Sequence, residues 1–80
     1  MRKFNSKSNI SGYIISKIRE EKDITKEEVC RQLQLIGINI DRVHLYRIEK
    51  CKVILKDFEL LAICRILKIN FDELTALLDD

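Results

Sequence analysis

The stretch "INIDRVHLYRIEK", residues 38–50, has the pattern of a short helix that follows a capping residue. Asp41 can accept a hydrogen bond from a backbone N–H of the first turn, so the helix is predicted to span about Arg42–Lys50. Successive residues turn by about 100° around a helix axis, which places Leu45 and Ile48 on one side. That side is predicted to pack against the rest of the fold.

The opposite side of this helix carries a different set of residues. It holds two arginines, a tyrosine and a valine: Arg42, Val43, Tyr46 and Arg47. His44 and Glu49 flank the side that packs. Folding gives no reason for an apolar side chain such as Val43 at the centre of an exposed face, so this side is predicted to contact another molecule.

Composition favours a small all-α bundle. The chain has 80 residues, enough for one domain; 46% are apolar and 35% are charged, which supports a core and a well-solvated surface. There is no proline, there are two glycines, and β-hairpin signals are missing. Residues 1–8 are polar and basic without a period, so we expect a flexible arm there and one domain over residues 9–80.

The sequence also favours a cytoplasmic protein. The segment "MRKFNSKSNI" lacks the apolar run of a signal peptide, and no window has the apolar length of a membrane span. The cysteines Cys30, Cys51 and Cys64 are odd in number and lack CxxC spacing, which favours reduced thiols over a disulfide framework. We expect all three to be small side chains in the core or at its edge.

Charge is segregated along the chain. Residues 42–56 carry five basic side chains and one acidic one, whereas residues 57–80 carry two basic and six acidic ones. The opening stretch lies mostly in the basic block. Segregation of this kind suits a polyanion on one face, although charge taken alone favours ordinary solvated helix surface.

Two helices are expected before residue 38. The first should run from Ser11 to Lys22, with Asn9 or Ser11 as its cap and Asp23 as a left-handed end. Its apolar stripe is Ile14, Ile15 and Ile18. The second begins at "TKEE", where Thr25 and Glu28 have the spacing of a capping box, and ends at Gly37. Its buried face is predicted to be Val29, Cys30 and Leu33.

Two further helices are expected after residue 56. One should span Asp57–Leu67 as the central core element, with a broad apolar set: Phe58, Leu60, Leu61, Ile63, Cys64 and Leu67. The last should run from Phe71 to about Leu78, with Asn70 as cap and Glu73 as its partner in a capping box. It offers Phe71, Leu74, Leu77 and Leu78 as apolar residues.

These five helices resemble the Cro/CI-type (XRE family) helix-turn-helix domain, a lambda-repressor-like fold. The resemblance covers residues 10–78 and is carried by "GYIISKIREEKDITKEEV", "DRVHLYRIEK" and "DFELLAICRILKINFDEL". Family members similarly have an arginine that ends the first motif, then an [ST]-[polar]-E-E-[LV] helix, an "RIE" that closes the recognition helix, and an "FELLA" core helix. The resemblance implies a compact five-helix bundle that contains a helix-turn-helix.

The chain departs from the simplest family members at four places. The turn "QLIGINI" is roughly four residues longer than theirs, as in a subset of the family. Lys26 stands where glutamine is usual at the start of the second helix. Cys51 replaces a common glycine after "RIE", and Lys56 occupies the place of a threonine or serine cap.

The resemblance implies sequence-specific binding of double-stranded DNA, with the third helix in the major groove. Arg42, Val43 and Arg47 fall at the base-contacting positions of the motif; for Val43 a partner-protein contact is the alternative. Contacts to the DNA backbone are expected from Thr25, Lys26, His44, Tyr46, Lys50 and Lys52. His44 alternatively fills the core edge as a neutral residue, and each lysine alternatively is solvated surface.

Two structural roles are also implied by the resemblance. Arg19 and Glu49 border the core and correspond to residues that the family commonly pairs, so we expect a partly buried salt bridge that orients the third helix. Such domains usually act as homodimers, and the candidate contact is Leu74, Leu77 and Leu78. The alternative for these three leucines is that they close the core.

The resemblance implies a transcriptional regulator, and specifically a repressor from a prokaryote, phage or mobile element. We expect no enzyme, cofactor or metal site, because the single His44 lacks partners at catalytic or ligand spacing. The main alternative is a protein-interaction module, of the antitoxin or anti-repressor type, that uses the third helix on protein. A third reading is an assembly domain in which the acidic last helix docks elsewhere.

Overall fold

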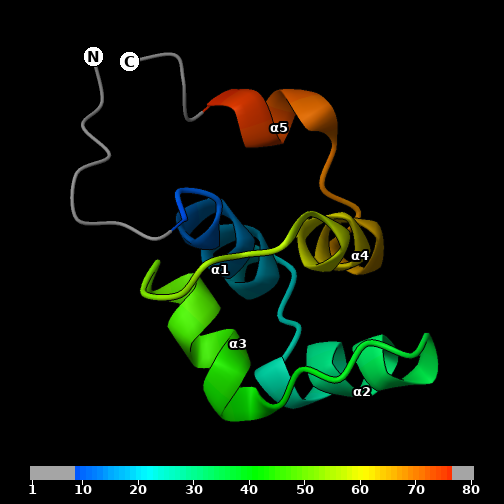
Figure 1. Cartoon of the computed structure of the whole chain (residues 1–80). Helices are drawn as coiled ribbons and strands as arrows, with labels where there is room; N and C mark the ends of the chain where they lie inside the picture. Colours follow the sequence, from blue (N-terminus) through cyan, green and yellow to red (C-terminus); the bar gives the residue numbers. More distant parts are fainter. Residues whose placement is uncertain (1–8, 77–80) are drawn as a thin grey trace.

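Five α-helices follow one another in residues 9–76, the part of the chain that the computed structural model describes (Figure 1). They are α1 (Gly12–Glu21), α2 (Lys26–Leu35), α3 (Arg42–Glu49), α4 (Asp57–Leu67) and α5 (Phe71–Thr75). Within residues 9–76 there is no strand. The predicted all-α five-helix fold is confirmed, and the bounds differ by at most two residues at each end of the first four helices.

Helices α1 and α2 each pack against both α3 and α4. Helices α3 and α4 are therefore held by the same two neighbours, α1 and α2. Figure 1 shows α5 on the far side of α1 from α2, reached by a short connection from α4. The arrangement leaves one side of α3 without a covering element in residues 9–76.

The core lies where α1 to α4 meet. Its largest fully buried side chains are Ile15, Val29, Leu33, Ile40, Leu45, Ile48, Ile63 and Leu67. The predicted buried faces of α2 and α3 are therefore confirmed; in α1, Ile15 and Ile18 are buried and Ile14 is partly buried against the core. Burial of this kind contributes about 1.5–3 kcal/mol for each such side chain relative to exposure.

The predicted apolar face of α4 was too broad. Phe58 is 51% exposed and Leu61 is 68% exposed, whereas Ala62, which was not among the predicted core residues, is buried. The reason is that α1 and α2 cover one side of α4 only. Cys64 and Leu60 lie at the border and pack against the core from there.

Side-chain caps set the starts of three helices as predicted. Thr25 Oγ1 accepts from the backbone N–H of Glu28 at 3.1 Å, and Asp41 Oδ1 accepts from that of His44 at 2.7 Å. Asn70 and Glu73 form the predicted capping box, with hydrogen bonds of 2.7 and 3.0 Å. The predicted extent of α5 beyond Ala76 lies outside the described residues.

The reciprocal half of the capping box predicted at α2 is wrong. The carboxylate of Glu28 accepts from Arg31 and from Gln32 one turn further along the helix. These hydrogen bonds lower the pKa of Glu28 to about 2, because each stabilises the charged form. A local ion pair on the same helix has replaced the contact with the backbone of Thr25.

The start of α1 is held by Asn9, not by Ser11. Asn9 Oδ1 accepts from the backbone N–H of Gly12 at 2.7 Å, and Ser11 makes no side-chain cap bond. Gly12 is required there because an added Cβ would lie 1.9 Å from the carbonyl oxygen of Ile48. The first turn of α1 therefore packs backbone to backbone against the end of α3.

Four helices end in residues with left-handed backbone. The predicted left-handed ends Asp23 and Gly37 have φ angles of 55° and 86°, and Lys68 has 58°. Cys51 has 60°, so the chain leaves α3 with the geometry that a glycine would supply, although the residue is a buried cysteine. Although Cys51 stands where glycine is common, its backbone keeps the left-handed conformation that a glycine would adopt.

The three cysteines are free thiols, as expected. Cys30 and Cys51 are buried and Cys64 is half-buried. Burial raises the pKa of the Cys30 and Cys64 thiols, because a thiolate would lose its hydration there. No helix within residues 9–76 is long and apolar enough to cross a bilayer.

Candidate nucleic-acid interface

The outward side of α3 is exposed along its whole length. Leu45 and Ile48 are fully buried, while Val43 is 59% exposed and Tyr46 is 47% exposed. Arg42 and Arg47 are also exposed on this helix. The helix thus has the two-sided character that its sequence predicts, with a valine at the centre of the solvent side.

The beginning of α2 and the outer side of α3 line one hollow. It has a volume of about 430 Å³ and is lined by Lys26, Arg42, Val43 and Tyr46. The first residue of α2 therefore lies beside the first turn of α3, as a helix-turn-helix requires. Arg47 does not line this hollow and lies further along α3.

The guanidinium of Arg42 is held by a residue that sequence analysis missed. Arg42 Nη1 lies 3.0 Å from Glu27 Oε2, and both side chains are mostly exposed. Glu27 gave no signal in the sequence, because an acidic residue in the first turn of a helix is common for reasons of the helix dipole alone. This ion pair joins α2 to α3 at the edge of the hollow.

The end of α3 carries a second basic group. The ammonium of Lys50 lies 5.6 Å from the ring centroid of Tyr46, within the range of a cation–π contact. Lys52 is exposed in the segment that follows. At the other end of the surface, the hydroxyl of Thr25 caps α2 and keeps its own proton free for donation.

His44 points partly inward. Its Nε2 is buried, has no hydrogen-bond partner within residues 9–76, and lies 3.8 Å from Glu59 Oε2 at the start of α4. Glu59 in turn accepts from the backbone N–H of Lys56. This orientation favours the core-edge position for His44 over a contact from Nε2 to a DNA phosphate.

The ion pair expected between Arg19 and Glu49 is present. Nε of Arg19 donates to Oε2 of Glu49 at 2.7 Å, and Nη2 donates to Oε1 at 3.1 Å. Both side chains are more than 90% buried. The hydrogen bond to Glu49 raises the pKa of Arg19, so the guanidinium stays charged despite its burial.

Asn9 also holds the end of α3, a role that sequence analysis missed. Its Nδ2 donates to the carbonyl of Val53 at 2.9 Å and to that of Ile48 at 3.3 Å. One amide thus caps α1, ends α3 and fixes the segment that leaves α3. The partners lie more than 35 residues away, so no local pattern identifies this contact.

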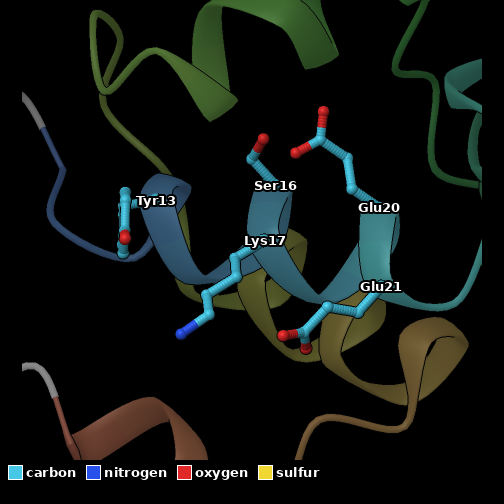
Figure 2. A pocket seen from close by; sticks show the side chains of 5 residues that line it. All are labelled: Tyr13, Ser16, Lys17, Glu20 and Glu21. Atoms are coloured by element: carbon cyan, nitrogen blue, oxygen red, sulfur yellow. The ribbon is translucent and has the colours of Figure 1, made fainter.

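A second hollow lies on the outer side of α1 (Figure 2). It has about 400 Å³ and is lined by Tyr13, Ser16, Lys17, Glu20 and Glu21. None of these was a predicted site residue. Two carboxylates and one ammonium give this surface a net negative charge, which repels phosphates. Substitutions in this hollow can therefore serve as controls for substitutions in the hollow between α2 and α3.

Comparison with known protein families matches residues 15–80 to the Cro/C1-type HTH DNA-binding domain. This match covers most of the chain, and the protein belongs to that family of DNA-binding domains. No curated protein and no solved structure matched in the corresponding searches. Within residues 9–76 no group of three or more His, Cys, Asp or Glu side chains could hold a metal ion.

Proposed function

We propose that this protein binds double-stranded DNA at specific sequences and acts as a transcriptional repressor, with α3 lying in the major groove. The observation that carries the proposal is the single hollow lined by Lys26, Arg42, Val43 and Tyr46. This hollow supports the proposal because two predicted backbone-contacting residues, Lys26 and Tyr46, and two predicted base-contacting residues, Arg42 and Val43, line it together. A groove of B-DNA accepts one helix, and α3 is the helix whose free side is basic.

In this proposal three side chains contact bases. Arg42 and Arg47 can each donate two hydrogen bonds to O6 and N7 of guanine, which supplies about 1–3 kcal/mol of discrimination per contact. Val43 lies between them on the helix surface and is 59% exposed, so its methyl groups can contact a thymine methyl. The helix would thus recognise a short G- and T-containing half-site.

Phosphate contacts would fix the position of the helix. Lys26 lies at the start of α2, where free backbone N–H groups also favour an anion. Lys50 and Lys52 flank the end of α3, and the hydroxyls of Thr25 and Tyr46 can donate to phosphate oxygens. Such contacts give affinity without sequence preference.

We also propose that the protein acts as a homodimer on two half-sites about one helical turn of DNA apart. Of the predicted contact residues, Leu74 packs against the core. Leu77 and Leu78 lie outside the described residues. The packing of Leu74 favours its role in closing the core over a role in the dimer contact.

A protein-interaction module is the second candidate function, because Val43 and Tyr46 are two exposed large side chains on one helix face. Salt dependence separates the two functions. DNA binding in which the three lysines neutralise about three phosphates per protomer should give a slope of about −2.7 in a plot of log K against log salt concentration. An apolar protein interface depends little on salt.

The test is fluorescence anisotropy with labelled duplex DNA between 50 and roughly 300 mM salt. Lys26→Ala should weaken binding to all duplexes and reduce the slope by about 1. Lys17→Ala, in the hollow on the outer side of α1, should change neither quantity. Absence of duplex binding at low salt would contradict the proposed function.

A further inference from the structure

The outer side of α4 is an apolar surface that no other helix in residues 9–76 covers, although the ammonium of Lys56 lies 5.9 Å from the centroid of the Phe58 ring. Phe58 and Leu61, three residues apart, lie next to each other on this side and are 51% and 68% exposed. Helices α1 and α2 pack on the opposite side of α4. Single exposed apolar residues are ordinary, but two neighbours on one helix face form a patch that suits a contact.

Two opposite charges lie at the ends of this patch. Asp57 stands four residues before Leu61 and Arg65 stands four residues after it, and all three are exposed. Spacings of four keep them on one face of the helix. Neither Asp57 nor Arg65 has an ion-pair partner in the described residues. One oxygen of Asp57 caps the backbone N–H of Phe58, which leaves the other available.

This order of charges is complementary to itself. In an antiparallel pair of α4 helices related by a two-fold axis through Leu61, the Asp57 of each copy faces the Arg65 of the other. The same axis places each Phe58 over Cys64, whose small side chain leaves room for the ring. Both ion pairs form at once, and the two Leu61 side chains meet at the centre.

We propose that a second copy of this chain docks on the outer side of α4, antiparallel and centred on Leu61. The inference deepens the homodimer of the proposed function and relies on it. We take a second copy as the occupant because the order of charges on this face matches itself in the antiparallel direction. Each half of the contact is small compared with about 800 Å² per partner in a stable complex, so the dimer is expected to be weak.

Charge reversal tests the arrangement in solution. Asp57→Arg gives a face with two cations and Arg65→Asp gives a face with two anions, so each variant alone should dimerise about tenfold or more weakly than wild type. An equimolar mixture of the two should form heterodimers, because both contacts then join opposite charges. The double variant should dimerise like wild type.

Sedimentation equilibrium gives the dimer constants, and thermal melts of each variant verify the fold. Lys17→Glu and Glu21→Lys reverse charges on α1 and should leave association unchanged; Leu61→Asp should abolish it. A wild type that stays monomeric at millimolar concentration would overturn the proposal, as would a mixture that associates no better than its components.

The DNA-binding proposal is judged separately, on a duplex with one half-site. The charge-reversed monomers should bind this duplex as wild type does. If they dimerise in the predicted pattern but no duplex is bound, the proposed function fails and the α4 contact stands. If the duplex is bound but the charge pattern is not followed, only the α4 contact fails.

Discussion

The guanidinium of Arg19 and the carboxylate of Glu49 join the last turn of α1 to the last residue of α3 through two parallel hydrogen bonds. A third donor of Arg19, Nη1, reaches the carbonyl of Ile24 at 2.9 Å, in the segment between α1 and α2. One buried side chain on α1 therefore holds both the end of α3 and the segment that leads into α2. We regard this pair as the element that sets the direction of α3.

Removal of one partner of this pair should be costly. Arg19→Met or Glu49→Leu leaves an unpaired buried charge and is expected to lower the free energy of unfolding by about 3–5 kcal/mol. The double variant leaves no such charge and should lose less than either single variant. Urea unfolding of the four proteins gives the coupling energy; additive losses would show that the pair acts as two separate side chains.

The side chain of Asn9 has two roles that can be tested separately: its oxygen caps α1 and its nitrogen donates to Ile48 and Val53. Asn9→Asp keeps the oxygen that caps Gly12 but replaces the donor to Ile48 and Val53 by an acceptor. We expect this variant to lose about 1–3 kcal/mol, because two carbonyls then face a carboxylate. Asn9→Ser, which also keeps a cap, is the matched control and should lose less. Equal stability of wild type and Asn9→Asp would contradict the role of the amide.

Glu27 is expected to restrain DNA binding. It is paired with Arg42 and lies at the edge of the hollow where phosphate would approach. Glu27→Gln releases the guanidinium and removes a repelling charge, so affinity for duplex DNA should rise about threefold or more at low salt. Glu21→Gln on α1 is the control. A decrease in affinity would mean that Glu27 instead holds Arg42 in its binding position.

The left-handed backbone of Lys68 is unfavourable for a residue with a side chain, and glycine would remove this strain. Lys68 has a φ of 58°, at the end of α4, and its side chain is exposed. Lys68→Gly should raise the free energy of unfolding by about 1 kcal/mol, and Asp23→Gly by less, since aspartate tolerates this backbone better. Lys17→Gly, at an exposed position in the middle of α1, should lower it by about 1 kcal/mol. Thermal melts give the order, and destabilisation by Lys68→Gly would contradict the argument.

Local patterns were sufficient for the fold. Caps at Thr25, Asp41 and Asn70 and the glycine at Gly37 each act through residues within four positions, so the sequence displays them directly. The two faces of α3 follow from the helical period alone. These features predict where each helix begins and which side of it is buried.

Contacts between distant segments were predicted less well. The link from Asn9 to Val53 and the pair of Glu27 with Arg42 depend on how helices cross, which no local period contains. The error at Phe58 and Leu61 has the same origin, because the pattern of α4 cannot show that its neighbours cover one side only. Arg19 and Glu49 were predicted together through the resemblance to the family.

The central claim is that the outward side of α3 contacts base edges, and Arg47 tests it most directly because it is exposed and no ion pair among the described residues engages it. Selection of bound duplexes from random DNA, with wild type and Arg47→Ala in parallel, compares sequence preference. Lys17→Ala serves as the control. We predict that Arg47→Ala loses about tenfold or more of the preference at one position of the selected motif. Selection of the same motif with equal strength by both proteins would contradict the account.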